Sequence, residues 1–234
     1  MLKQVDLKIK EVIKRNYNVI SIRLGIESEP DFEAGQFLNA CFTGEKQCCR
    51  YLSISSSPTE NGYIEFTKKL TGSDFSLMLE AAKPADIISV QYPFGKFTLS
   101  GLKSKVAFLS GGIGITPIRS MCKFAVDENL GIDMVLIYAN RSVNDIVFKE
   151  DFDQMQKQYP LLKVAHVISE PASGFDCTVG RINAQVIKAK APDYLERKFY
   201  LCGPPPMVIA MEKILSEELS LPKENIIVEQ FQGY

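Results

Sequence analysis

The pattern of hydrophobic and polar residues changes near residue 100 and divides the chain into two halves. In the first half, short apolar runs are separated by turn residues such as Glu60-Asn61-Gly62, which is typical of antiparallel strands. These runs predict strands at 6–13, 19–24, 36–42, 50–55, 63–68 and 87–92. Over 75–82 apolar residues recur at helical spacing instead, which predicts one helix. We therefore expect an antiparallel β-barrel that carries one helix, with a sandwich as the alternative.

In the second half, strand and helix patterns alternate. Strands are predicted at 106–109, 134–138, 161–168, 199–202 and 226–230, and helices at 117–126, 149–158 and 206–219. This alternation implies an α/β doubly wound parallel sheet with helices on both faces. A length of 234 residues allows one to two domains, and the change of pattern predicts two, residues 1–101 and 102–234.

Composition and charge exclude several classes of function. The chain is 46% apolar and 24% charged, with a net charge of -1, as in ordinary folded proteins. It has no basic block, so nucleic acid is discounted as a partner. No apolar run reaches the ~18 residues of a membrane span, and the first residues mix charged and apolar side chains, so no signal peptide is expected. These features predict a cytoplasmic protein.

Histidine and cysteine usage argues against a metal site. The single histidine, His166, disfavours zinc and Ser-His-Asp chemistry, and its apolar surroundings favour a packed strand residue. Cys48 and Cys49 are adjacent, but no cysteine spacing suits zinc or an iron-sulfur cluster. Because structural disulfides are rare in a reducing compartment, buried or free thiols are expected. The six cysteines are Cys41, Cys48, Cys49, Cys122, Cys177 and Cys202.

The strongest local motif is Ser110-Gly111-Gly112-Ile113-Gly114-Ile115-Thr116-Pro117, which lies between a predicted strand and a predicted helix. Glycines let the backbone approach a diphosphate, and the helix N-terminus stabilises its charge. Thr116 is the predicted N-cap and Pro117 the first helical residue. The alternative is a tight turn without a ligand. The motif departs from the Rossmann fingerprint, because Pro117 replaces the third glycine and no acid ends the next strand at Tyr138-Ala139-Asn140.

A second turn, Cys202-Gly203-Pro204-Pro205-Pro206-Met207, also joins a strand to a helix. In a parallel sheet, ligands bind at the carboxyl ends of the strands, so both turns are expected to open on one crevice. Cys202 would then face that crevice. Alternatively, the prolines simply start a helix and Cys202 is a small buried residue.

These two turns resemble those of the pyridine-nucleotide domain of the ferredoxin-NADP reductase superfamily, with its Gly-Gly-x-Gly-x-Thr-Pro and Cys-Gly-Pro-Pro-x-Met motifs. Four motifs of the first half fall in the order and spacing of the family's flavin-binding barrel. They are Gly35-Gln36-Phe37, Arg50-Tyr51-Leu52-Ser53, Gly72-Ser73-Asp74-Phe75-Ser76 and Pro93-Phe94-Gly95. The resemblance covers nearly the whole chain, and it implies a flavin domain followed by an NAD(P)H-binding domain.

The resemblance assigns roles to the Arg50 motif. Arg50 would pair with a flavin phosphate, because its planar fork suits bidentate recognition. Tyr51 and Leu52 would adjoin the flavin, and Ser53 would lie by its N5 atom as a catalytic residue. The family has tyrosine where this chain has Leu52, so an aromatic contact with the ring is missing or replaced by an aliphatic one.

The other flavin contacts are implied at the start of the 75–82 helix. Gly72, Ser73 and Ser76 would hold the pyrophosphate there, by the same physics as the Gly112 turn. The implied cofactor is FAD, with FMN less favoured.

The resemblance also implies a nicotinamide site. Glu229 would approach the nicotinamide and act with Ser53 and Cys202, whereas without the family context it is equally well a solvated acid. Either Phe231 or Tyr234 would cover the flavin face. The implied nucleotide-binding residues of the two turns are Gly111, Gly112, Gly114, Thr116, Pro117, Cys202, Gly203, Pro204 and Met207.

The choice between NADH and NADPH rests on Arg141 and Ser142, which follow the strand at 134–138. Both would suit a 2'-phosphate, which predicts a weak preference for NADPH. Alternatively, Arg141 pairs with Asp145 at the surface. Five lysines form either a solvated face or a docking site for an acidic redox carrier. They are Lys68, Lys69, Lys96, Lys103 and Lys105.

We therefore predict a flavin-dependent oxidoreductase that passes hydride from NAD(P)H to FAD and electrons onward to a separate carrier such as ferredoxin or flavodoxin. The carrier must be separate because this chain has no cluster ligands. Two alternatives remain: a flavin reductase that releases free reduced flavin, and a non-catalytic nucleotide-binding subunit of a larger complex.

Overall fold

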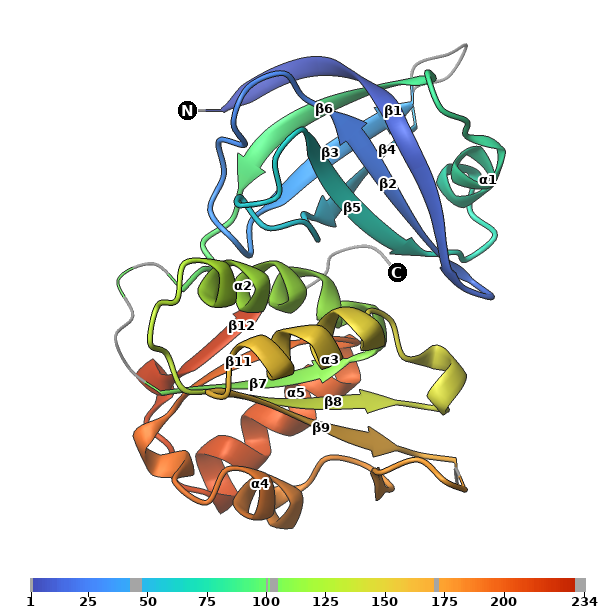
Figure 1. Ribbon diagram of the computed structural model, residues 1–234. Helices are drawn as coiled ribbons and strands as arrows, with labels where there is room; N and C mark the ends of the chain where they lie inside the picture. Colours follow the sequence, from blue (N-terminus) through green and yellow to red (C-terminus); the bar gives the residue numbers. More distant parts are fainter. Residues whose placement is uncertain (1, 43–47, 100, 102–104, 171–172, 230–234) are drawn as a thin grey trace.

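The computed structural model describes residues 2–42, 48–99, 101, 105–170 and 173–229, and these form two β-sheets, one in each half of the chain (Figure 1). The N-terminal sheet is antiparallel, in the order β4-β3-β6-β1-β2-β5. Its strands are β1 (Lys3–Asn16), β2 (Val19–Gly25), β3 (Phe37–Phe42), β4 (Cys48–Ser53), β5 (Tyr63–Lys69) and β6 (Ile87–Phe94). All six predicted strands are therefore confirmed.

The sheet curls until its two edge strands meet. Ile54 forms a bridge with Phe66, and the Ser55 N–H donates to the Glu65 carbonyl at 2.7 Å. Alternate side chains point into the curl, where Leu38 and Phe66 are fully buried. Helix α1 (Asp74–Ala81) covers one end with its apolar face. The antiparallel barrel with one helix is thus the observed architecture.

The C-terminal sheet is parallel, in the order β10-β9-β8-β7-β11-β12. Its strands are β7 (Val106–Gly111), β8 (Met134–Asn140), β9 (Leu162–Ile168), β10 (Thr178–Val179), β11 (Lys198–Cys202) and β12 (Ile226–Glu229). Its helices are α2 (Ile115–Asp127), α3 (Lys149–Gln158), α4 (Ala184–Lys190) and α5 (Pro205–Lys213).

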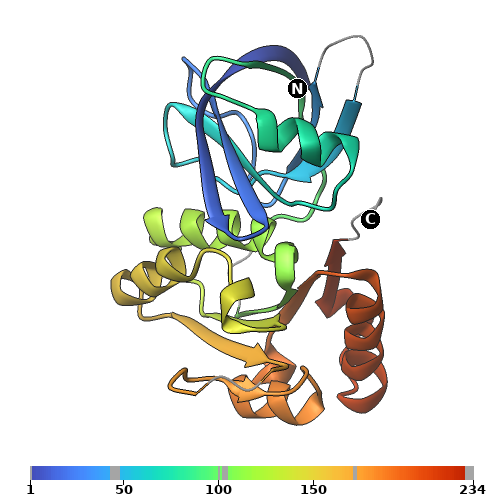
Figure 2. The same ribbon diagram turned by 90° about the vertical axis from the view of Figure 1, so that its right-hand side faces the viewer.

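Helices cover both faces of this sheet, as the alternating pattern predicts (Figure 2). Phe108 and Leu136 pack with α2 and α3 on one face. Leu109 and Ile137 pack with α4 and α5 on the other. The strands read as continuous apolar runs because they are buried on both sides.

Four local features differ from the sequence expectation. The short elements α4 and β10 were not predicted, since seven and two residues carry too little periodicity. Thr116 is not an N-cap: α2 begins at Ile115 after a 3₁₀ turn, and the Thr116 hydroxyl donates to the Ile113 carbonyl at 3.1 Å. The last predicted helix ends as α5 at Lys213 and continues as a π-helical turn over Ile214–Glu218.

The expectation that all cysteines are thiols is wrong for two of them. Cys41 and Cys49 form a disulfide, while Cys48 is free. The antiparallel pairing of β3 with β4 places Cys41 directly opposite Cys49, with their Cα atoms 4.1 Å apart. Strand register, which spacing alone does not reveal, brings them together.

The two halves pack closely against each other. Val19, Ala34 and Phe97 of the first half belong to the same buried apolar cluster as α2. Gly35 has a positive φ of 101°, and a Cβ there would overlap the Phe97 carbonyl and press on Met121 of α2. The domain boundary at 101/102 remains a prediction. Within the described ranges, every helix is too short or too polar to cross a bilayer.

Candidate functional site

Three polar residues line up at the carboxyl ends of β7, β11 and β12. Cys202 is in register with Ser110 on one side and with Glu229 on the other. Such neighbours in a parallel sheet project from the same face. The buried Ser110 hydroxyl has no hydrogen-bond partner among the described residues. The sheet therefore brings the predicted Cys202 and Glu229 together and adds Ser110, which begins the glycine motif but was given no role from the sequence.

Burial controls the charge of this row. It raises the pKa of Glu229 to about 7. Burial, and then the nearby Glu229 carboxylate, raise the pKa of the Cys202 thiol well above its usual value. Cys202 therefore stays a neutral thiol, while Glu229 changes charge near neutral pH. Cys202 is also fully buried, so it does not face an open crevice as expected.

The glycines of the two turns serve two different purposes. A Cβ at Gly111 would overlap the Met207 sulfur, and a Cβ at Gly114 would overlap the Cys202 carbonyl. These glycines, with Gly203, let the two turns pack directly on each other. Only Gly112 fits the predicted cradle: its φ is +52°, and the space where its Cβ would lie is open.

Tyr138, a residue that was not identified from the sequence, supports the open Gly112 turn through hydrogen bonds. The Tyr138 hydroxyl donates to the Gly112 carbonyl at 3.0 Å and accepts from the Val147 N–H at 3.3 Å. Thr116 and Pro117 form the first turn of α2 behind it, and Pro204 is the N-cap of α5. The N-termini of α2 and α5 thus open beside each other, which favours an anion there.

The predicted flavin-phosphate residues lie on the barrel. Arg50 is exposed on β4 and forms no salt bridge among the described residues, and its guanidinium donates to its neighbour's carbonyl, that of Cys49, at 2.8 Å. Burial and the nearby Arg50 charge lower the pKa of Lys68 on β5. Two cations therefore adjoin without a carboxylate between them, an arrangement that an anion stabilises. Lys68 is thus a candidate ligand that the sequence assigned only to a general basic face.

Tyr51 does not replace the missing tyrosine at position 52. Its ring packs edge-on against Phe37 and Phe94, with centroids 5.8 Å from each. Neighbouring residues of a strand point to opposite sides, so Leu52 lies on the other face of β4 from Tyr51. The aliphatic Leu52 and the buried Ser53, which ends β4, are left at the predicted flavin position.

The predicted pyrophosphate turn is a capped helix N-terminus, where the Ser73 hydroxyl accepts from the Ser76 N–H and Ser76 is buried. Ser73 is the N-cap of α1, and its hydroxyl lies 3.1 Å from that of Ser76. Gly72 has a φ of +71°, and the space beside it is open. Helix α1 packs beside β4, so this turn and Arg50 belong to neighbouring elements.

Arg141 and Ser142 have partners of their own. The Arg141 Nε lies 2.6 Å from the Glu170 carboxylate, and its side chain is 81% exposed. The predicted alternative partner, Asp145, instead accepts from Ser142 at 2.7 Å and from Tyr17. The sequence missed Glu170 because this acid follows β9, the next strand, rather than β8.

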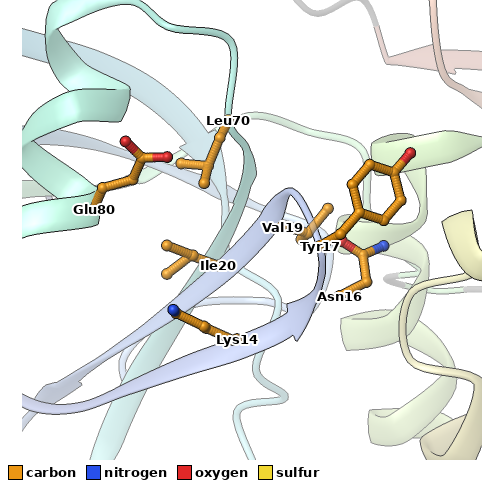
Figure 3. Close-up of a pocket in the computed structure, with 7 residues that line it drawn as sticks. All are labelled: Lys14, Asn16, Tyr17, Val19, Ile20, Leu70 and Glu80. Atoms are coloured by element: carbon orange, nitrogen blue, oxygen red, sulfur yellow. The ribbon is translucent and has the colours of Figure 1, made fainter.

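Two further grooves lie away from these residues. One, of about 360 Å³, lies between the β1–β2 hairpin and α1 and contains no predicted site residue (Figure 3). The other, of about 220 Å³, includes His166, Asp176 and Cys177. His166 lies on β9, the predicted strand, where it is half-buried and its ring contacts Phe175; burial lowers the pKa of His166, which keeps it neutral at pH 7.

Some predictions lie outside the described residues: Phe231, Tyr234 and Lys103. Among the other lysines, Lys105 is paired with Asp193 and Glu196, so it is not available as a docking cation.

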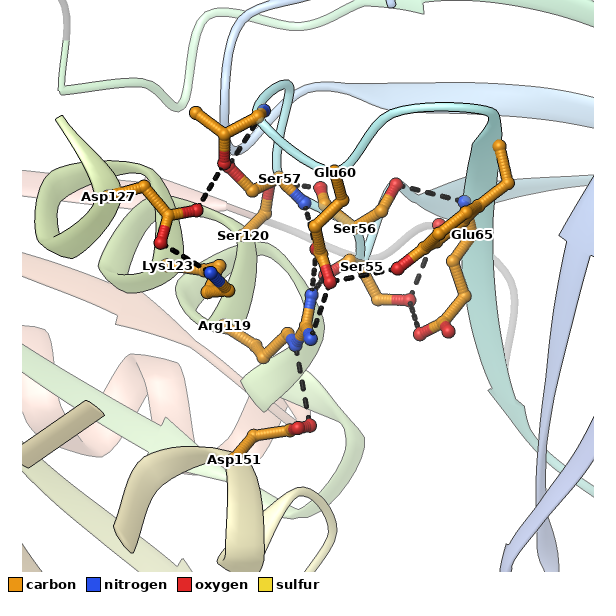
Figure 4. Close-up of polar contacts among 12 residues, drawn as sticks. Ser55, Ser56, Ser57, Glu60, Glu65, Arg119, Ser120, Lys123, Asp127 and Asp151 are labelled. Atoms are coloured by element: carbon orange, nitrogen blue, oxygen red, sulfur yellow. Dashed lines mark hydrogen bonds and ion pairs between the residues drawn. The ribbon is translucent and has the colours of Figure 1, made fainter. Parts of the chain in front are cut away.

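A buried ion pair between the halves was also missed. Arg119 of α2 binds Glu60 in the loop between β4 and β5 (Figure 4). One feature of the sequence could have revealed this pair: Arg119 stands between the apolar Ile118 and Met121 of the predicted helix, where a cation needs a buried partner.

Comparison with known proteins agrees with this architecture. Residues 4–99 match the family described as Oxidoreductase FAD-binding domain, and residues 108–213 match Oxidoreductase NAD-binding domain. The cytochrome b5 reductase domain of Ulva prolifera nitrate reductase has a similar fold, with a TM-score of 0.85, 23% identity and 97% of each chain covered.

Curated relatives include reductases of two kinds. NADH-cytochrome b5 reductase 1 of Aspergillus fumigatus is 30% identical over 89% of this chain and 72% of its own length. The glycine betaine monooxygenase reductase subunit of Pseudomonas aeruginosa is 32% identical over 79% of this chain. The match spans 52% of that relative, so this chain covers about half of its length.

Proposed function

The chain belongs to the ferredoxin-NADP reductase family, with an FAD-binding and an NAD-binding oxidoreductase domain, and from this we propose that it transfers hydride from NAD(P)H to bound FAD and passes the electrons to a separate carrier. The observation that carries the proposal is the row of Ser110, Cys202 and Glu229. It lies at the carboxyl ends of the parallel strands, next to an open helix N-terminus.

The residues on the barrel fit FAD. Arg50 and Lys68 supply positive charge without a carboxylate partner among the described residues, and a diphosphate would neutralise it. The space beside Gly72 is open, and the half-buried Ser73 hydroxyl at the start of α1 suits a phosphate oxygen, whereas the Ser76 hydroxyl is buried and bonded to Thr71 and Ser73. Because Leu52 stands in place of an aromatic residue, the protein binds the flavin ring less tightly than it binds the phosphates.

The nucleotide turns fit a dinucleotide in the same way. The Gly112 backbone is open, and the unpartnered Ser110 hydroxyl can donate to a carboxamide oxygen. Ionised Glu229 beside it stabilises positive charge that develops on the nicotinamide ring. Cys202, which is buried and neutral, lies between these two groups.

When bound, the flavin supplies the redox chemistry, since it takes a hydride, two electrons with one hydrogen nucleus, from nicotinamide C4 and releases electrons singly. The protein contributes the relative position of the two reacting groups. Ser53 at the end of β4 and the Ser110–Cys202–Glu229 row belong to different halves, so hydride transfer takes place where the halves meet. Holding the reacting atoms together makes the transfer effectively unimolecular.

The electron acceptor is proposed only as a class of protein. An external one-electron carrier or a partner redox enzyme is the proposed acceptor, in keeping with relatives named as reductase components. A cytoplasmic location and the weak preference for NADPH remain predictions.

The visible absorption spectrum of the purified protein tests the proposal. We expect flavin bands that bleach on adding NADH or NADPH and return when a one-electron acceptor such as ferricyanide is added. Loss of flavin on gel filtration, with turnover on added free flavin, would instead indicate a flavin reductase. Protein that binds nucleotide but never bleaches would be a non-catalytic subunit.

A further inference from the structure

Helix α2 links the two predicted cofactor sites directly. Its first turn carries Thr116 and Pro117 of the nucleotide turn. One turn later, Arg119 and Ser120 reach the loop that follows Ser53 (Figure 4). The segment that would hold the nicotinamide and the segment beside flavin N5 are therefore joined through a few side chains.

The Arg119 guanidinium is buried, and its two terminal nitrogens are hydrogen-bonded while its Nε has no hydrogen-bond partner among the described residues. Its residue is 3% exposed, and its Nη1 donates to the Ser55 carbonyl at 3.1 Å. Both terminal nitrogens bind the Glu60 carboxylate, with Nη2 at 3.0 Å from Oε1. Nε lies 3.5 Å from Asp151 of α3. A bidentate pair of this kind fixes both the distance and the angle between α2 and the loop that carries Glu60.

Neighbouring bonds make the loop rigid around this pair. Glu60 also accepts from the Ser57 N–H at 2.6 Å and the Tyr63 hydroxyl at 2.9 Å. Burial opposes ionisation of Glu60, but the Arg119 guanidinium outweighs it and the pKa of Glu60 lies below its usual value. The pair thus stays charged at neutral pH.

A second chain of bonds ties the same loop to the barrel. The Ser55 hydroxyl donates to buried Glu65 at 2.9 Å, and Arg15 and Arg23 neutralise that carboxylate. Ser120 of α2 donates to the Ser56 carbonyl at 2.6 Å. The loop at 55–60 is therefore fixed from both halves.

We propose that Arg119 is a positioning residue for hydride transfer: by fastening α2 to the loop after Ser53, it sets the separation between the nicotinamide turn and the flavin N5 position. This inference rests on the proposed function. Arg119 does not touch the reacting groups, and its effect is geometric. Because misplacement by ~1 Å lowers such a rate by on the order of a hundredfold, loss of the fork should slow transfer more than it weakens binding.

The chain offers a matched control in Arg197. It is 4% exposed, and its guanidinium binds Asp193, Asp133 and the Val106 carbonyl. All three partners lie in the C-terminal half, at the amino ends of β7, β8 and β11 rather than at the site. Losing this buried arginine therefore perturbs stability without changing how the halves meet.

The test compares Arg119→Lys, the double variant Arg119→Met/Glu60→Met and the control Arg197→Lys, each loaded with FAD. The double variant removes both charges of the Arg119–Glu60 pair and leaves only Asp151, whose side chain is 30% exposed, without its arginine, so it keeps the test open if Arg119→Lys does not fold. Stopped-flow bleaching over a range of NAD(P)H gives the limiting rate and the dissociation constant separately. Hydrogen exchange of peptides that span residues 55–60 measures how firmly the loop is held, and this measurement does not depend on enzyme activity.

We expect both Arg119 variants to lose at least about tenfold in limiting rate, with flavin content and nucleotide affinity within about threefold of the parent. Exchange at 55–60 should rise in these variants and not in Arg197→Lys. An unchanged limiting rate, or an equal loss in Arg197→Lys, would overturn the positioning role while the proposed function stands. A parent protein that is never bleached would overturn the proposed function itself, and the positioning role with it.

Discussion

Cys202 and Glu229 are paired in register at the carboxyl ends of β11 and β12, and burial raises the pKa of the Glu229 carboxyl to about 7. Glu229 lies beside the proposed nicotinamide position, and a carboxyl there that titrates near neutral pH would make the rate of flavin reduction depend on pH. Below pH 7 Glu229 is mostly neutral, and above it the proposed role has the carboxylate stabilise positive charge on the ring.

We expect the limiting rate of flavin reduction to rise between pH 6 and pH 8, with an apparent pKa near 7, because ionised Glu229 favours the transition state. In Glu229→Gln the profile should be flat and the rate should stay at its low-pH value. Stopped-flow bleaching across this range measures it. A profile that is identical in both proteins would show that another group titrates.

Arg50→Ala should weaken flavin binding by at least ~1.5 kcal/mol, about tenfold, because a charge-assisted contact is lost and the phosphate charge stays unpaired. Lys68→Ala should act in the same direction. Titration of apoprotein with FAD measures both, with Lys69→Ala as the neighbouring control. An unaltered affinity in Arg50→Ala would make this arginine an ordinary surface residue.

Cys202→Ala should lower the rate of flavin reduction more than it lowers flavin content, since the thiol lies between Ser110 and Glu229. Cys122 is an equally buried cysteine of α2, so Cys122→Ala is the matched control for lost packing. Stopped-flow rates and bound-flavin absorbance are compared. Equal behaviour of the two variants would assign Cys202 to packing alone.

The ratio of kcat/KM for NADPH to that for NADH should slightly exceed one and should fall in Arg141→Ala. Arg141 now pairs with Glu170 at 2.6 Å, but an exposed pair of this kind is weak and a 2'-phosphate can replace the carboxylate. Glu170→Gln should therefore raise the ratio. A native preference for NADH, or a ratio indifferent to Arg141, would reject the assignment.

Reduction of the Cys41–Cys49 disulfide should destabilise the barrel by about 2 kcal/mol, because it releases a short closed loop with a sequence separation of 8. Cys41→Ala/Cys49→Ala should show the same loss, and Cys48→Ala should not. Denaturant titration with and without dithiothreitol measures it. Mass spectrometry that finds six free thiols in the purified protein would contradict the pairing.

The sequence by itself determined the order of the elements and all of the longer ones, but not the short α4 and β10. All six barrel strands were predictable, because alternation of apolar residues is set by the two sides of each strand. The helix at 149–158 was predicted to the residue, since helical periodicity is a local property. The two strand-to-helix turns were found for the same reason, as their glycines and prolines act within a few residues.

The tertiary structure alone decided which residues meet. Register across separate strands pairs Cys41 with Cys49 and aligns Cys202 with Glu229. Gly111 and Gly114 looked like phosphate-binding glycines, but they are required by the contact between two turns about ninety residues apart in the chain. The Arg119–Glu60 pair joins the two halves. Local patterns do not encode such partners, because their positions follow from how sheets and helices pack, and burial then sets their charge.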